Sequence, residues 1–408
     1  MTPSSVPGRS ASPGIRLVLI LGFVAFITSF GAHIVAVNLP EYAQTIGVGV
    51  AVIGLLIAAY DLAELVAKPL FGALADRRGM KQTMLAGIAV FTLASLAYPL
   101  LDPRLLLIVR FAQGAGAAAL SAVSLAMVGA YYRDKPGRAY GIYNAIKGAG
   151  YVVSPAIGTA IVVRSQFAAI FVVSAGIGVV GFILSLTLPK PAVDQAPGGD
   201  DDDQFSLTSF ISVFRRSDLW PWYLVTVVNM FLVGILFGFL PVRLHELRYG
   251  AIATGILLTA ATASYLLVQP VAGILADRIR PERTIYIGLA VAAVGVMSIG
   301  LFRDLPLFIA TVAAGIGIGI VWTNTDVLIS GWARSGQLGA TMGAAGSFKE
   351  FGDMLGPLLI GILAQALGLS VAFAICGALG LLSLTFLIRS RPASRRAPSP
   401  TTTRPPDQ

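Results

Sequence analysis

The chain has 408 residues, of which 56% are hydrophobic and only 12% are charged, and its mean hydropathy is +0.81. A soluble globular protein carries roughly 25% charged residues, so this composition excludes an ordinary soluble enzyme and is typical of a polytopic helical membrane protein. The net charge of +9 does not call for nucleic acid as a partner, because lysines and arginines that flank membrane helices account for it.

Cysteine and histidine are too scarce for most metal or redox sites. Cys376 is the one cysteine, and His33 and His245 are the two histidines. Neither an intramolecular disulfide nor a Cys/His metal site can form from this set, although a site built from carboxylates alone stays open. The sequence contains no phosphate-binding loop and no grouping of a nucleophile with a base, so we expect a protein that is not an enzyme and uses no cofactor.

Twelve apolar segments, each long enough to cross a bilayer, follow one another along the chain. A hydrocarbon core of about 30 Å needs about 20 apolar residues in a helix. The first segment begins at Leu17; it is longer than the core of a signal peptide and lacks an obvious cleavage site, so we expect a retained helix. The segments are 17–39, 50–71, 82–101, 104–131, 138–163, 167–188, 220–242, 250–272, 283–302, 305–332, 339–365 and 369–389.

A polar stretch divides these segments into two groups of six. It contains Pro197–Gly199 followed by four aspartates, which is typical of a flexible linker, and its residues 205–214 could form a short amphipathic helix on the membrane surface. We therefore expect an all-α membrane protein with two six-helix halves. Its parts are a cytoplasmic tail at 1–16, halves at 17–188 and 220–389, a cytoplasmic linker at 189–219 and a disordered cytoplasmic tail at 390–408.

The distribution of lysine and arginine predicts the orientation in the membrane. With the N-terminus inside, the cytoplasmic segments hold 20 of the 29 lysines and arginines, the external loops hold 5 and the helices hold 4. Because basic residues concentrate in cytoplasmic loops, we expect both termini to lie inside, in a cell (inner or plasma) membrane.

The two groups of six repeat one another in sequence. Lys68–Arg77 aligns with Gln269–Arg278 at an offset of 201 residues (269 minus 68), and Gly114–Gly116 aligns with Gly315–Gly317 at the same offset. Halves related by an axis along the membrane normal place a substrate site at their interface, near the bilayer midplane. At an offset of 202, Gly141, Lys147, Gly150 and Pro155 align with Gly343, Lys349, Gly352 and Pro357.

Two motifs resemble those of the major facilitator superfamily, and the resemblance covers essentially the whole chain. The pattern Gly72-x-x-x-Asp76-Arg77-x-Gly79-x-Lys81 is similar to the family's signature loop between helices 2 and 3. The stretch from Arg110 to Gly116 is similar to its motif in helix 4. The resemblance implies the family's fold, with twelve helices in two pseudo-symmetric halves, and secondary transport by alternating access. The pattern is closest to the drug/proton antiporter-like members.

Glycines and prolines in segments 138–163 and 339–365 resemble the helix-packing motif associated with antiporters. Ser154 and Thr159 stand where that motif has glycine, which weakens the inference to drug/proton antiport. Glycine-rich helix faces permit close packing and sliding. The residues expected to pack in this way are Gly141, Gly150, Pro155, Gly158, Gly352, Gly356 and Pro357.

The signature loop is expected to act as a conformational gate. Its carboxylate at Asp76 can sit at a helix N-terminus of the other half, where the helix dipole favours an anion, and Arg77 can pair with nearby acidic groups. The alternative is a solvated turn whose arginines only set the topology. The expected gate residues are Gly72, Asp76, Arg77, Gly79, Lys81, Asp277 and Arg278.

Four charged residues within the helices are candidates for proton coupling. Asp61 and Glu64 lie on one helix face with Lys68, and a charge at this depth normally faces a cavity or a partner. The alternative is that Lys68 extends to the cytoplasmic interface with Glu64 as its structural partner. The family resemblance implicates Arg110 in proton coupling, although it could instead be an interfacial anchor. Asp326, which has no evident partner in its segment, completes this set.

Further polar residues are expected to line the substrate cavity. Lys147 and Lys349 occupy equivalent places in the two halves, and Lys349 can pair with Asp353 four residues on, while Glu350 points elsewhere. The alternative is a set of buried structural ion pairs. The four cations and five carboxylates within the helices leave one negative charge, as a single proton site requires. The expected cavity residues are His33, Gln113, Lys147, Lys349, Glu350 and Asp353.

These observations favour proton-coupled efflux of small amphipathic or drug-like compounds. A proton-coupled transporter of an organic anion or metabolite is a second hypothesis, supported by the two lysines. A non-transporting membrane receptor or lipid-handling protein on the same scaffold is a third. The expected partners are a small-molecule substrate, protons and the lipid bilayer, with no nucleic acid and no obligate protein partner.

Overall fold

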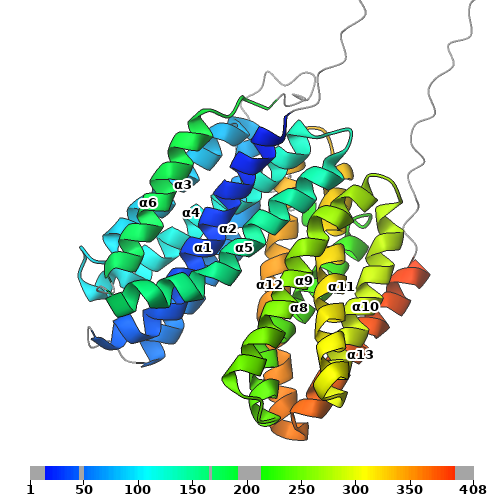
Figure 1. The fold of residues 1–408 in the computed structure, drawn as a ribbon. Helices are drawn as coiled ribbons and strands as arrows, with labels where there is room; N and C mark the ends of the chain where they lie inside the picture. Colours follow the sequence, from blue (N-terminus) through cyan, green and yellow to red (C-terminus); the bar gives the residue numbers. More distant parts are fainter. Residues whose placement is uncertain (1–13, 46–49, 165–167, 192–212, 391–408) are drawn as a thin grey trace, which may run out of the picture.

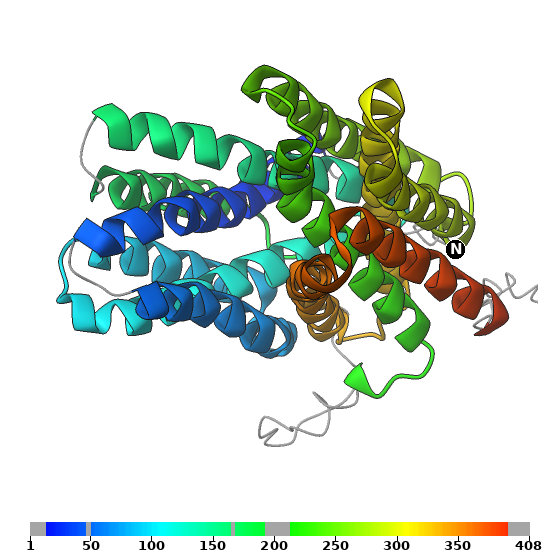
Figure 2. The same cartoon turned by 90° about the horizontal axis from the view of Figure 1, so that it is seen from below.

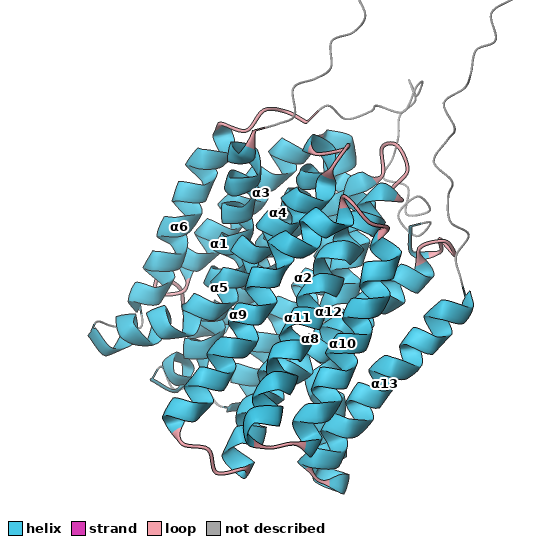
Figure 3. Cartoon of the chain, turned by 45° about the vertical axis from the view of Figure 1, so that its right-hand side comes forward, coloured by secondary structure: helices cyan, strands magenta, loops and turns pink. Residues whose placement is uncertain are grey.

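The computed structural model describes residues 14–45, 50–164, 168–191 and 213–390. Within these ranges it contains twelve α-helices and a 3-10 turn, and no strand (Figures 1 and 3). The helices are α1 (Ile15–Thr45), α2 (Val50–Arg78), α3 (Met80–Ala97), α4 (Leu106–Tyr131), α5 (Pro136–Arg164), α6 (Ala168–Leu186), α8 (Trp220–Glu246), α9 (Ala251–Ala276), α10 (Pro281–Leu301), α11 (Asp304–Gly331), α12 (Leu338–Leu367) and α13 (Leu369–Ser390).

The helices confirm the predicted all-α membrane fold. Ten of them are long and apolar enough to cross a membrane by length and composition. The other two, α2 and α5, carry charged residues along their length, among them Asp61, Glu64 and Lys68 in α2 and Lys147 in α5. Helices that carry charge at this depth normally face a cavity or a partner rather than lipid.

Six helices form each of two lobes. Figures 1 and 2 show α1–α6 on one side and α8–α13 on the other. The main contacts between the lobes are α2 with α12 and α5 with α9. These two contacts are related by the internal repeat, because α2 corresponds to α9 and α5 corresponds to α12.

Glycine pairs bring the backbones of the lobes together at one end of the molecule. A Cβ atom on Gly72 of α2 would lie 2.1 Å from the carbonyl oxygen of Gly339 in α12. A Cβ atom on Gly273 of α9 would likewise lie 2.1 Å from the carbonyl oxygen of Gly137 in α5. No side chain fits at these positions, so each pair is a direct backbone contact. We call this end of the molecule the closed end.

The stretch Gly72–Lys81 is not a loop, which corrects the prediction. Helix α2 continues to Arg78 and α3 begins at Met80, so Gly79 alone separates them, with a φ of +99°. Alanine, leucine and arginine, which fill most of residues 73–78, are good helix formers and carry α2 through the motif. Glycine adopts this positive φ without the steric cost that other residues meet.

Several predictions fall outside the described residues. These are the N-terminal tail, apart from its last three residues, the C-terminal tail after Ser390 and most of the linker with its amphipathic helix at 205–214. Only the end of that helix, Val213–Phe214, is described, and it is helical. The proposed domain limits therefore stay predictions.

Candidate functional site

A cavity of about 1140 Å³ lies between the lobes. Its walls come from α1, α2, α4 and α5 of the first lobe and from α12 of the second. In α2 the lining residues lie between 55 and 65. Gly72 and Asp76, which make the contacts of the closed end, lie nearer the C-terminus of the same helix, so the cavity is offset from the closed end. Most of the lining is apolar or aromatic. The charged residues in it are Asp61, Glu64, Arg110, Lys147, Glu350 and Asp353.

Three of these charged side chains face the cavity without a neutralising partner. Asp61 is exposed and Asp353 and Lys147 are half-buried. Among the described residues, no hydrogen bond or ion pair to these three charged groups is found. Charges that lack a protein partner inside a membrane protein are costly, so they are normally kept for an ion or a substrate.

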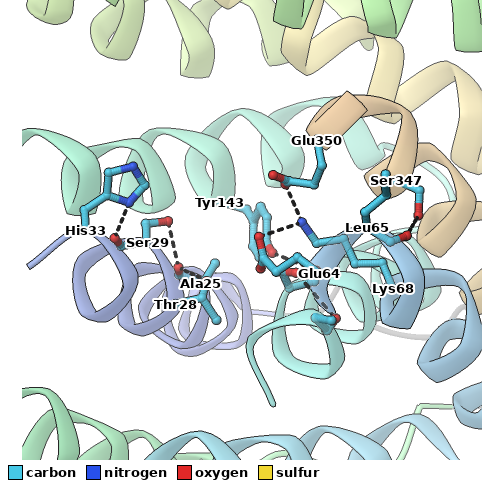
Figure 4. Close-up of polar contacts among 12 residues, drawn as sticks. Ala25, Thr28, Ser29, His33, Glu64, Leu65, Lys68, Tyr143, Ser347 and Glu350 are labelled. Atoms are coloured by element: carbon cyan, nitrogen blue, oxygen red, sulfur yellow. Dashed lines mark hydrogen bonds and ion pairs between the residues drawn. The ribbon is translucent and has the colours of Figure 1, made fainter. Parts of the chain in front are cut away.

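Lys68 joins the two lobes through carboxylates. Its ammonium group lies 3.2 Å from the Oε2 atom of Glu64 in the same helix and also forms an ion pair with Glu350 of α12 (Figure 4). The Lys68 side chain is only 3% exposed. It does not extend to the membrane interface, which answers one of the alternatives raised by the sequence. One helical turn away, the Ser347 hydroxyl donates to the carbonyl oxygen of Leu65 at 2.5 Å, so two polar contacts join α2 and α12 here.

Arg110 is a buried residue and not an interfacial anchor. It is 1% exposed, its guanidinium group lies 4.3 Å from the centroid of the Tyr60 ring, and its Nη1 atom donates to Oε1 of Gln113 at 2.8 Å. Gln113 also accepts from the Tyr98 hydroxyl and donates to Ser95. Gln113 is fully buried and does not line the cavity; it orients Arg110 instead.

Asp326 and Lys349 form a buried ion pair, which corrects two predictions. Lys349 Nζ lies 2.6 Å from Asp326 Oδ1, so Asp326 is not alone and Lys349 does not pair with Asp353. Asn144 of α5 donates to the other oxygen of Asp326 at 2.9 Å, across the lobe boundary. A fully buried carboxylate is costly without a partner, and Lys349 reaches it from the neighbouring helix. Asp326 and Lys349 do not line the cavity.

His33 lines the cavity from α1. Its Nδ1 atom lies 3.0 Å from the carbonyl oxygen of Ser29, so the ring donates a hydrogen bond there (Figure 4). The ring of Tyr151, four residues after Lys147 in α5, packs edge-on against it with centroids 4.3 Å apart. Tyr151 was missed from the sequence, although a spacing of four places it on the face of Lys147.

The expected gate carboxylates each cap a helix of the other lobe. Asp76 accepts backbone hydrogen bonds from Gly339 at 2.7 Å and Ala340 at 2.8 Å, at the start of α12. Asp277 accepts from the backbone of Gly137 at 2.8 Å and Arg138 at 2.9 Å, at the start of α5. An anion at a helix N-terminus satisfies unpaired N–H groups and is favoured by the helix dipole.

The basic gate residues behave differently from the two carboxylates. Lys81 donates to the carbonyl oxygens of Leu186 and Leu188, at 2.7 and 2.6 Å, so it tethers the end of α6 within its own lobe. Arg77, near the end of α2, and Arg278, just after α9, are both exposed. The carboxylates of Asp76 and Asp277 both make hydrogen bonds between the lobes.

The glycine motifs of α5 and α12 mostly pack within their own lobes. Gly150 lies against the backbone of α1 at Phe30, and Gly352 and Gly356 lie against the carbonyl oxygens of Val227 and Phe231 in α8. Gly141 instead meets Gln269 of the other lobe. Gly158 is buried, Pro357 packs on Gly234 and Gly238 of α8, and the side chain of Pro155 lies outside the described residues.

The described side chains offer no evident metal site. No group of three or more His, Cys, Asp or Glu residues among them is arranged to hold a metal ion.

Comparisons with known proteins point to one family. The family model described as the Major Facilitator Superfamily matches residues 21–258 and 223–406. The uncharacterized transporter YebQ of Escherichia coli is 24% identical over 87% of this chain and 90% of its own length. The multidrug resistance protein MdtL of E. coli is 26% identical over 89% of this chain and 93% of its own length. The E. coli fucose:proton symporter FucP has a similar fold, with a TM-score of 0.75 at 14% identity over 91% of this chain and 98% of that chain.

Proposed function

Because the chain belongs to the major facilitator superfamily and is a multi-pass membrane transporter, we propose that it exports small amphipathic compounds in exchange for protons. The observation that carries this proposal is the cavity between the lobes, which is mostly apolar but holds the unpaired carboxylates of Asp61 and Asp353. An apolar pocket with a few charges suits molecules that combine an apolar body with a charged group.

Alternating access is supported by the offset between the cavity and the lobe contacts. Arg133 and Arg334 lie beside Asp76 at the closed end, and by the positive-inside rule such basic residues favour a cytoplasmic position for this end. In this state the cavity would face the outside. Transport would then require the glycine contacts and the caps made by Asp76 and Asp277 to separate, while the lobes approach one another at the other end.

The charge balance at the cavity supports a proton site. Three cations (Lys68, Arg110 and Lys147) and four carboxylates (Asp61, Glu64, Glu350 and Asp353) lie in its wall or directly bound to it, which leaves one negative charge. Asp61 is the exposed member of this set, so it is our candidate for the proton-carrying carboxylate. Arg110, whose guanidinium carbon lies over the Tyr60 ring, would stabilise the deprotonated form of the site.

Export of drug-like compounds is supported by the similarity to MdtL, a multidrug resistance protein. An organic anion is the second candidate substrate, and the unpaired ammonium group of Lys147 favours it. The two candidates differ in the charge that the cavity must attract, and one experiment separates them.

The test is a substrate screen with the purified protein in liposomes, reading proton movement with a trapped pH-sensitive dye. We expect lipophilic cations to drive protons in the opposite direction to their own movement. Proton movement only with organic anions would favour the second candidate. If no member of either panel moves protons through the wild-type protein, the proposal of proton coupling is wrong.

A further inference from the structure

The two lobe contacts share a backbone arrangement but differ in charge. The carbonyl oxygen of Lys68 meets Gly343 where α2 crosses α12, and the carbonyl oxygen of Gln269 meets Gly141 where α9 crosses α5. A Cβ atom on either glycine would lie 2.4 Å from that oxygen. Lys68 and Gln269 are related by the repeat offset of 201, so the same position is a cation in one contact and a neutral amide in the other.

The partner position differs in the same way. Glu350, which pairs with Lys68, corresponds to Gly148 at the offset of 202 (350 minus 202). The α2–α12 contact therefore carries an ion pair between lobes that the α5–α9 contact does not have at the equivalent place. An asymmetry at a position where the backbone is otherwise repeated indicates a role for the charges beyond packing.

We infer that the Lys68–Glu350 ion pair is a proton-released lock between the lobes, with Lys68 as a positioning residue and Glu350 as the group whose charge holds or releases the closed end. This inference rests on the proposed proton coupling, to which it adds the step that turns proton binding into movement. Lys68 touches no substrate in this scheme and acts through the two carboxylates that it holds.

The exposures of Glu350 and Lys68 fit this role. Glu350 is 23% exposed and lines the cavity, so protons can reach it from there, whereas Lys68 is 3% exposed. When Glu350 is neutral, Lys68 keeps Glu64, a partner in its own helix. The ion-pair attraction between the lobes is then lost, while the intrahelical pair persists.

Other charged groups surround this lock. Lys147 of α5 and His33 of α1 lie within electrostatic range of Glu350, as do Asp353 of its own helix and Asp61 of α2. A substrate or proton that binds any of them changes the charge balance around Glu350, so the lock is sensitive to the content of the cavity as well as to its pH.

The Asp326–Lys349 pair shows what a structural ion pair looks like in this molecule. Asp326 is 0% exposed and Lys349 is 7% exposed, and neither lines the cavity. Both belong to the second lobe, so neutralising this pair removes no ion pair between lobes. It is buried and closed to the cavity, in contrast to the Lys68–Glu350 pair, and its contact with the other lobe is the neutral amide of Asn144.

The experiment measures distances between spin labels in the reconstituted protein, in a Cys376→Ala background. Asp134→Cys with Ser335→Cys reports the closed end, and Asp102→Cys with Arg303→Cys reports the opposite end; all four positions are exposed. Glu350→Gln should lengthen the first distance, shorten the second and shift the population ratio about tenfold or more, since breaking a buried ion pair changes an equilibrium by at least that factor.

Matched variants separate the effect of charge from the effect of packing. Lys68→Gln copies the residue of the other contact and should give the same shift. The Glu64→Gln/Lys68→Gln/Glu350→Gln triple variant, which removes all three charges of this cluster, should also give it if a single variant fails to fold. Gln269→Met, at the equivalent place, should leave both distances unchanged. Lowering the pH should shift the wild-type protein in the same direction, and Glu350→Gln should no longer respond.

Wild-type distances and a wild-type pH response in Glu350→Gln would overturn the lock. An equal shift in Gln269→Met would show that any change at these contacts opens the molecule, which also contradicts the role of charge. Because the labels report conformation without substrate, failure of the lock is separate from failure of proton-coupled export, which the liposome assay alone decides.

Discussion

Asp76 accepts a hydrogen bond from the backbone nitrogen of Gly339 at 2.7 Å, across the boundary between the two lobes. One carboxylate thus caps the first turn of a helix that belongs to the other half of the repeat. The equivalent carboxylate of Asp277 does the same for α5. If Asp76 and Asp277 form the expected gate, these two caps are the contacts that must break when it opens, and each can be tested by substitution.

Asp76→Asn should open the closed end. The amide keeps one acceptor oxygen but loses the second and the negative charge, at a cost of about 1 kcal/mol, or about a fivefold change in population. Thiol labelling of Ser330→Cys, which lies at the lobe boundary near Gly129, measures the opening. Asp277→Asn should act in the same direction, and Asp134→Asn, on an exposed loop, should have no effect. Unchanged labelling in both cap variants would contradict the gate and would favour the alternative that this motif only sets the membrane topology.

Gly72→Ala should separate the lobes at the closed end more strongly than the loss of a cap. Its Cβ atom would lie 2.1 Å from the carbonyl oxygen of Gly339, and a contact of that length forces one backbone to move. We expect greater labelling at Ser330→Cys and a reduced transport rate. Gly176→Ala is the control, because a Cβ atom there meets nothing within 4 Å. If Gly72→Ala behaves like Gly176→Ala, the backbone contact does not define the closed state.

Asp326→Asn should destabilise the protein without uncoupling it. Removing one partner of a buried ion pair costs about 3–5 kcal/mol, because the other charge is left uncompensated. Thermal unfolding in detergent should show a lower midpoint, and Asp326→Asn/Lys349→Met should recover much of the loss. A normal midpoint together with lost proton movement would instead support the coupling role that the sequence suggested for Asp326.

Arg110→Lys should reduce proton-driven transport while leaving the protein folded. Lysine keeps the positive charge but lacks the guanidinium group that both lies over the Tyr60 ring and donates to Gln113, so the charge would no longer be fixed beside the cavity. The ratio of substrate moved to protons moved in liposomes measures the effect. Gln113→Leu should weaken coupling in the same direction, because it removes the acceptor that orients Arg110. Normal ratios in both variants would contradict the role of Arg110 in coupling.

The helices and their repeat could be predicted from the sequence, because hydropathy and a constant offset are local signals. The position of Asp76 at a helix N-terminus of the other lobe was also expected, since the helix dipole favours it. The continuation of α2 through Gly72–Arg78 was missed. The charged residues of this stretch suggested a loop. However, its alanines, leucine and arginines favour a helix, and Gly79 alone is enough to make the turn into α3.

The pairing of the buried charges could not be predicted. The spacing of four residues within α12 favours a pair between Lys349 and Asp353. Helix packing instead brings Lys349 to Asp326 of α11, which the spacing does not reveal. Lys68 likewise has an obvious partner in Glu64, but its link to Glu350 joins residues 282 positions apart. Asn144 gave no signal at all, because a lone amide in an apolar helix does not reveal which carboxylate it meets.

The most direct test of the proposed mechanism is substrate-induced proton movement in liposomes that contain the Asp61→Asn variant. We expect a substrate to move protons through the wild-type protein but not through this variant. Asp102→Asn, on an exposed loop, should behave as wild type. Spin-label distances check that the variant is folded. Undiminished proton movement through Asp61→Asn would contradict the account, because the carboxylate that faces the cavity would then not be the one that carries the proton.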